Sequence, residues 1–211
     1  MRLRRKFLKS AKLYLILDTA VHDYRALFNI ARQALKGGVH IFQLRDKLGS
    51  ARDILQFSRR IMPALKDEAL YIINDRLDLA LLLDADGVHL GQEDIPVDEA
   101  RHLAKKNMII GTSCQSIRHV NVAIKDGVDY IGLGSVFKTK TKPDRDPMDL
   151  KLLRAASCFS DVPIFPIGGI TQENVRVIQQ CGIHRAAICR SISEASDVKK
   201  AVQFFRNALE G

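Results

Sequence analysis

The sequence has no long hydrophobic run and no paired cysteines. Its apolar runs are only as long as a strand, well short of the roughly 18 residues that a membrane helix needs. The 4 cysteines form neither a C-x-x-C pair nor a zinc-finger spacing, so we expect reduced thiols in a cytoplasmic protein. With 211 residues, 46% of them hydrophobic, the chain can form one globular domain with a full core, which excludes a disordered protein.

Acidic residues are missing from the start of the chain. Residues 1–12 contain no Asp or Glu, but they hold six of the basic residues behind the formal net charge of +9. No apolar stretch of signal-peptide length follows them. The segment is either an arm that binds nucleic acid or a solvated, partly helical lead-in, and we favour the lead-in. We therefore expect a basic lead-in at residues 1–12 and a single catalytic domain at residues 13–211, with no membrane or nucleic-acid partner.

Short aliphatic runs alternate with longer amphipathic stretches along the chain. Strict alternation of this kind predicts parallel strands joined by helices. The G-x-G-x-x-G turn of an open, doubly wound sheet is missing, and eight units of about 26 residues suit a closed barrel. We therefore expect an α/β fold, an eight-stranded parallel (β/α)8 TIM barrel. The predicted strands are residues 12–17, 39–44, 70–73, 87–90, 108–112, 130–133, 163–167 and 186–189, and the clearest helices are residues 23–36, 51–65, 97–105, 116–125, 172–180 and 197–209.

In such a barrel, the chemistry lies where the strands end and the loops to the helices begin. The second predicted strand ends in an amide and two cations, Gln43, Arg45 and Lys47, which share the inward face because they alternate with Phe42 and Leu44. A guanidinium and an ammonium together suit a polyphosphate. The alternative is a pair of exposed loop charges bonded to the aspartate between them, and this strand alone does not decide.

Two aspartates follow the next two strands. Asp75 and Asp94 are about one strand–helix unit apart, so they lie on adjacent loops and both carboxylates could reach one ion. Mg²⁺ is commonly held by one or two carboxylates together with substrate phosphates. The alternative is that both are helix N-caps, a frequent position for Asp. With the two cations on the preceding strand, we favour a Mg²⁺ site.

Hydroxyls and lysines follow the fifth and sixth strands. Ser113 ends the fifth strand, and the loop after the sixth carries Thr139, Thr141 and Lys142 without the spacing of a Walker loop. Such a loop provides donors and charge for a phosphate and can close over a ligand. The alternative is a disordered basic loop.

Glycines follow the seventh strand. Gly168 and Gly169 allow backbone N–H groups to approach an anion at the start of a helix, although tight turn packing also explains them. The eighth strand ends in Cys189 and Arg190, and the loops after these two strands are the usual monophosphate site of barrels. The sequence thus predicts two anion pockets, for two phosphorylated substrates or for one molecule phosphorylated at both ends.

These segments, in this order, resemble the thiamine phosphate synthase family from about residue 13 to residue 209. The matching motifs are QLRDK (43–47), IIND (72–75), DGVHLGQED (86–94), GTS (111–113), DYIGLGSVFKTKTK (129–142) and PIGGIT (166–171). The resemblance implies a transferase of thiamine biosynthesis. It would join hydroxymethylpyrimidine diphosphate to hydroxyethylthiazole phosphate and release diphosphate, in a dissociative substitution assisted by Mg²⁺.

The resemblance also implies a role for each candidate residue. The pyrimidine diphosphate would contact Gln43, Arg45, Lys47, Asn74, Ser113 and Lys142, of which Arg45, Lys47 and Lys142 would be the catalytic charges. Asp75 and Asp94 would hold Mg²⁺. The thiazole phosphate would contact Thr139, Thr141, Gly168, Gly169, Cys189 and Arg190.

Two positions depart from the family pattern. Gln115 stands where relatives commonly have His, and Arg190 lies in a segment that is usually a run of small residues. The related thiazole tautomerases share the fold and are expected to use that His for proton transfer, which Gln cannot perform. They also typically lack the T-x-T-K loop, so we favour the synthase. A tautomerase-like enzyme or a catalytically idle phosphate-binding barrel is the alternative, and a homo-oligomer stays open.

Overall fold

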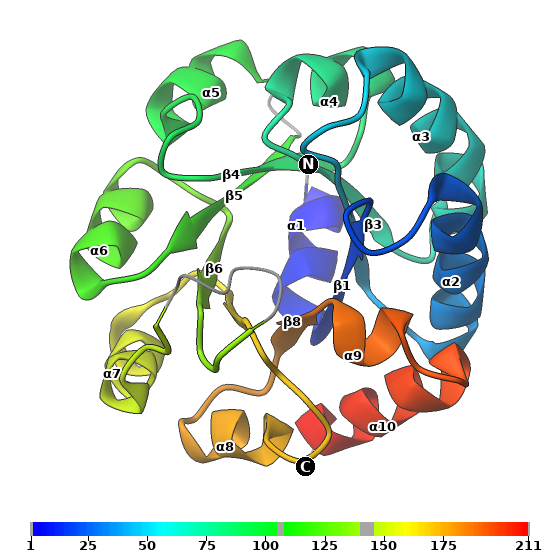
Figure 1. Ribbon diagram of the computed structural model, residues 1–211. Coiled ribbons are helices and arrows are strands. Elements are labelled where there is room, and N and C mark those ends of the chain that lie inside the picture. Colours follow the sequence, from blue (N-terminus) through cyan, green and yellow to red (C-terminus); the bar gives the residue numbers. More distant parts are fainter. Residues whose placement is uncertain (1, 105–107, 140–145, 211) are drawn as a thin grey trace.

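A computed structural model describes residues 2–104, 108–139 and 146–210 of the chain. Eight parallel strands form a closed barrel in sequence order, and β8 pairs back onto β1, which confirms the predicted fold class (Figure 1). The observed bounds match the predicted ones for β4 and differ by one or two residues at an end for the others. The strands are β1 (Leu13–Asp18), β2 (Ile41–Arg45), β3 (Leu70–Asn74), β4 (Gly87–Leu90), β5 (Ile109–Cys114), β6 (Tyr130–Gly134), β7 (Ile164–Ile167) and β8 (Ala186–Ile188).

Helices follow the strands and form an outer ring around the barrel (Figure 1). The clearest predicted helices did not include α4, α7 or α9. The α4 sequence LDLALLL is apolar almost throughout and gives no amphipathic period. No helix within the described residues is both long and apolar enough to span a membrane. The helices are α1 (Arg2–Ser10), α2 (Tyr24–Gly37), α3 (Ala51–Leu65), α4 (Leu77–Leu83), α5 (Val97–Leu103), α6 (Ile117–Lys125), α7 (Leu150–Phe159), α8 (Val175–Gln180), α9 (Arg190–Ser193) and α10 (Val198–Glu210).

The strands are buried on both faces, as a parallel sheet covered by helices requires. Phe42 and Leu44 of β2 belong to the large cluster between strands and helices, whereas Ile41 belongs to the smaller cluster inside the barrel with Tyr14 and Phe165. Side chains therefore alternate along β2 as predicted. Apolar side chains fill the barrel interior near the amino-terminal ends of the strands. Polar residues therefore gather towards the carboxyl ends of the strands.

Helix α1 packs against the amino-terminal end of the barrel, beneath the strands in Figure 1. Leu8 is only 2% exposed and joins the cluster inside the barrel. Arg4 and Arg5 form ion pairs of 2.6 and 2.8 Å with Asp86 and Asp129, which immediately precede β4 and β6. The expectation of a solvated lead-in thus holds for only one face of the helix. Its other face is buried, because an uncovered barrel end would expose apolar interior side chains to water.

Replacement of Leu8 should test this packing. We expect Leu8→Ala to lower the free energy of unfolding by about 3 kcal/mol, because it removes buried methyl groups and leaves a cavity. Urea denaturation measures the change, and Leu82→Ala is the matched control, since Leu82 of α4 is 64% exposed and should cost less than about 0.5 kcal/mol. Equal effects in the two variants would contradict the role assigned to α1.

Candidate active site

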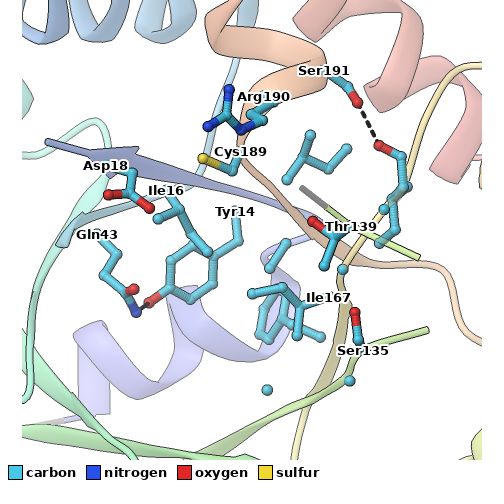
Figure 2. A pocket seen from close by; sticks show the side chains of 18 of the residues that line it. Tyr14, Ile16, Asp18, Gln43, Ser135, Thr139, Ile167, Cys189, Arg190 and Ser191 are labelled. Atoms are coloured by element: carbon cyan, nitrogen blue, oxygen red, sulfur yellow. Dashed lines mark hydrogen bonds between the residues drawn. The ribbon is translucent and has the colours of Figure 1, made fainter. Parts of the chain in front are cut away.

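A cavity of about 710 Å³ opens at the carboxyl ends of the strands, and all eight strands contribute to its lining (Figure 2). This volume lies within the range of small-molecule sites. In Figure 2, Asp18 and Gln43 lie on one side of the cavity and Ser135 and Thr139 on the other. The candidate residues that line it are Gln43, Arg45, Asn74, Ser113, Thr139, Gly168, Gly169, Cys189 and Arg190.

The end of β2 places an amide and a guanidinium in the cavity wall. Gln43 is buried, and its side-chain amide donates a 2.8 Å hydrogen bond to the Tyr14 hydroxyl. Arg45 donates to a carboxylate oxygen of Asp18 at 2.8 Å, and this aspartate, at the end of β1, is only 2% exposed. A buried carboxylate of this kind fixes the guanidinium and compensates part of its charge.

Lys47 forms an ion pair with Asp75, the residue that follows β3. The alternative interpretation of Arg45 and Lys47, as loop charges bonded to Asp46, is therefore wrong, because they pair instead with Asp18 and Asp75 at neighbouring strand ends. Lys47 is not part of the cavity lining. Its partner Asp75, however, directly follows Asn74, which lines the cavity. The ammonium thus lies beside the cavity at the β2–β3 side.

The two predicted metal ligands lie next to each other. The Asp75 and Asp94 side chains are in hydrogen-bond contact, and burial together with the nearby Asp75 raises the pKa of Asp94. The backbone N–H of Gly91 donates to Asp94 at 2.6 Å. Neither aspartate is a helix cap, because the N-cap residues of α4 and α5 are Arg76 and Pro96, which rules out that alternative.

A divalent cation suits this pair of acids. Two carboxylates in contact repel each other when both are ionised, and a cation between them removes the repulsion. The described residues contain no group of three or more His, Cys, Asp or Glu side chains that could hold a metal. Two carboxylates are nevertheless what Mg²⁺ commonly uses together with substrate phosphates. The buried side-chain nitrogen of Asn74, which has no acceptor among the described residues, also leaves a donor for a ligand here.

A chain of hydrogen bonds crosses the floor of the cavity. The Tyr14 and Tyr130 hydroxyls are 2.8 Å apart, and Tyr130 lies 3.0 Å from Nδ1 of His89. Nε2 of His89 lies 2.9 Å from the hydroxyl of Ser113. Burial raises the pKa of both tyrosines, so their hydroxyls remain protonated. The chain joins Ser113 to Gln43 through His89, Tyr130 and Tyr14, which lie on three other strands.

Sequence reasoning missed Tyr14, Tyr130 and Asp18 as parts of the site. Tyr14 and Tyr130 are 116 positions apart in the sequence, and only barrel closure brings their hydroxyls together. Their positions in the predicted strands could have identified them as site residues. All three lie on the inward face of a predicted strand or at its end, as Gln43 does.

The opposite side of the cavity is formed by close backbone approach. Gly168 and Gly169 have φ values of 102° and 63°, and a Cβ on either would overlap the segment after β6, at Ser135 or Lys138. Glycine is therefore required at both positions. The contact places Thr139 beside these glycines in the cavity wall.

The end of β8 adds a thiol and a second guanidinium. Burial raises the pKa of Cys189 to about 12, so the thiol stays neutral. Arg190 forms an ion pair with Glu194, and both line the cavity. The Ser191 hydroxyl donates a 2.6 Å hydrogen bond to the carbonyl of Ile170, which ties the β8 end to the loop after β7 (Figure 2).

Two candidate residues, Thr141 and Lys142, lie outside the described residues. The structure brings all the others to the same end of the barrel. Arg45 and Lys47 lie on the β2–β3 side with the two acids, and the glycines, Thr139 and Arg190 lie across the cavity. One cavity can thus receive a diphosphate on one side and a monophosphate on the other.

Comparison with known proteins agrees with this geometry. The family model described as thiamine monophosphate synthase matches residues 13–192. The thiamine-phosphate synthase of Shouchella clausii is 37% identical over 205 residues, 96% of this chain and 98% of the relative, and that of Pyrococcus abyssi is 38% identical over 205 residues, 97% of each. The solved structure of thiamine phosphate pyrophosphorylase from Pyrococcus furiosus superposes with a TM-score of 0.87 at 35% identity, covering 98% of this chain and 97% of that one. The chain belongs to the thiamine monophosphate synthase family.

Proposed function

We propose that the enzyme condenses hydroxymethylpyrimidine diphosphate with hydroxyethylthiazole phosphate to give thiamine phosphate and diphosphate. The observation that carries this proposal is one cavity lined by Arg45 on one side and by a glycine turn on the other, with Lys47 and the two contacting carboxylates beside the Arg45 side. A site for a single monophosphate would not need the cations and carboxylates of the β2–β3 side. Family membership supports the same reaction.

The β2–β3 side suits the pyrimidine diphosphate. Arg45 and Lys47 would contact the diphosphate group, together with Ser113 and Lys142. Gln43 and Asn74 would contact the same substrate with their amides, and the spare nitrogen of Asn74 supports this role. Held by Asp18, Arg45 already has a fixed orientation before the substrate binds.

Asp75 and Asp94 would hold Mg²⁺, and when bound the ion would supply positive charge to the leaving diphosphate. Lys47 lies against Asp75, so its ammonium can exchange a carboxylate partner for a phosphate oxygen as the ligands assemble. The β2–β3 side would therefore provide positive charge where the leaving group develops negative charge.

The glycine side suits the thiazole phosphate. Gly168 and Gly169 leave space for backbone N–H groups to approach an anion, and Thr139 and Arg190 would add a hydroxyl and a charge, beside the backbone of Cys189. Thr141 would contribute in the same way. Two separate phosphate anchors then fix the distance and direction between the reacting atoms.

The proposed reaction needs no general base. The bond between the pyrimidine methylene carbon and the diphosphate oxygen breaks first, and its electron pair leaves with the diphosphate. The lone pair of the thiazole nitrogen then forms the new carbon–nitrogen bond, and no proton has to be removed from that nitrogen. Charge stabilisation and positioning are therefore the main tasks of the protein.

Omission of substrates and replacement of Arg45 test the reaction. We expect diphosphate release only when both substrates are present. We expect Arg45→Ala to lower the rate of release by about 100-fold or more, because the variant lacks one positive charge that stabilises the leaving diphosphate. A coupled diphosphate assay measures the rate. Arg32→Ala is the control, since Arg32 lies exposed on α2. Turnover of a single monophosphate without release of diphosphate would instead indicate a tautomerase-like enzyme.

Removal of divalent metal tests the role of the acids. We expect chelation to stop diphosphate release and added Mg²⁺ to restore it. Asp94→Asn should raise the Mg²⁺ concentration for half-maximal rate by at least about tenfold, because a ligand charge is lost. Asp98→Asn is the matched control, since Asp98 lies exposed on α5. Full activity in the presence of a chelator would refute the Mg²⁺ site.

A further inference from the structure

The loop after β2 carries a carboxylate between the two cations that are proposed to bind the diphosphate. Asp46 lies between Arg45 and Lys47 in the sequence, but it pairs with neither of them. Its oxygen Oδ1 accepts hydrogen bonds from the backbone N–H groups of Leu48, at 3.1 Å, and Gly49, at 2.6 Å. The loop after β2 therefore folds back onto a single side chain.

The other carboxylate oxygen ties this loop to the helices behind it. Oδ2 of Asp46 accepts a hydrogen bond from the hydroxyl of Tyr24, the first residue of α2. The Tyr24 ring in turn packs on Phe57 of α3, with 5.1 Å between ring centroids. The loop is thus anchored to the two helices that precede and follow β2 in the sequence.

Gly49 shows how closely the loop fits its anchor. A Cβ at this position would overlap the carboxylate of Asp46, so the turn can approach the acid only with glycine here. At the tip of the loop, Leu48 is 95% exposed and packs on nothing that would hold the loop by itself. The position of the loop therefore depends on Asp46.

The electrostatics of Asp46 agree with an anchored, ionised acid. Burial alone would raise its pKa, but hydrogen bonds from Tyr24, Gly49, Thr19 and Leu48 outweigh burial, and the net pKa is lowered. The same carboxylate, together with burial, raises the pKa of Tyr24, which therefore keeps the proton that it donates. Each hydrogen bond is charge-assisted, which makes it stronger than a neutral one.

We propose that Asp46 is a positioning residue, whose carboxylate holds the loop after β2 so that Arg45 and Lys47 are directed to the diphosphate. This inference rests on the proposed function, because it assigns the two cations to that group. Asp46 itself does not touch the substrate. Asp46 acts through the backbone of the loop, which places the Lys47 side chain against Asp75.

The sign of the effect on diphosphate binding distinguishes this role from simple electrostatics. Asp46 is negative, so its removal beside two cations would by itself tighten the binding of an anion. If the acid positions the cations, its removal must instead weaken binding. We expect Asp46→Ala to raise the dissociation constant of inorganic diphosphate, measured by calorimetry with Mg²⁺, by about tenfold.

Two further variants change the same loop in different ways. Asp46→Asn should recover most of the affinity, because an amide oxygen can still accept from the two backbone N–H groups. Gly49→Ala should weaken binding like Asp46→Ala, although it keeps the charge, because the added Cβ pushes the turn from the carboxylate. In steady-state assays, Asp46→Ala should raise the KM for the pyrimidine diphosphate and leave the KM for the thiazole phosphate unchanged.

Asp86→Ala is the matched control. Asp86 also accepts a backbone hydrogen bond, from Tyr71 at 2.8 Å, but at the other end of the barrel. Its replacement should lower Tm without changing diphosphate affinity.

Unchanged or tighter diphosphate binding by Asp46→Ala, or equal losses for both substrates, would overturn the proposal. If Asp46→Ala does not fold, Tyr24→Phe serves instead: about threefold weaker binding supports the proposal and unchanged binding overturns it.

The binding measurement also separates this inference from the reaction itself. A wild-type enzyme that binds diphosphate but releases none from the two substrates would refute the proposed function only. The comparison of Asp46→Ala with Asp86→Ala would then still decide whether Asp46 positions the cations.

Discussion

Closure of the sheet is the constraint on which the rest of the molecule depends. The hydrogen bonds between β8 and β1 turn a parallel sheet into a barrel, and they bring the ends of the first and last strands to one rim. Asp18 and Arg190, far apart in the sequence, thereby line the same cavity. Each candidate residue that lines the cavity comes from a strand end or from the segment that follows it, so its position follows from the register of the strands.

Charge at this rim is compensated across neighbouring strands. Arg45 of β2 pairs with Asp18 of β1, and Lys47 after β2 pairs with Asp75 after β3. Arg190 similarly pairs with Glu194. An enzyme that must bind two anions can therefore fold with these three cations in place, since each of the three has an acid nearby when the anions are absent.

The sequence allowed a good part of this arrangement to be predicted. Strand–helix alternation predicts the barrel, and the period of two along β2 places Gln43 and Arg45 inside it. The buried face of α1 could not be predicted, because Leu8 stands among basic residues and its partners lie on strands far along the chain. Asp18 was missed for a related reason: its partner Arg45 is adjacent only through strand pairing. The roles of the individual site residues stay predictions, and Thr141 and Lys142 lie outside the described part of the chain.

The pairing of Arg45 with Asp18 has a consequence for turnover. Free diphosphate carries more charge than the same group in ester linkage, so a cluster of uncompensated cations would hold the product more firmly than the substrate. The enzyme would then be limited by departure of its own by-product. In the proposed reaction, the buried acid at the end of β1 would compete with diphosphate for the guanidinium and so favour an emptied site, ready for the next pair of molecules.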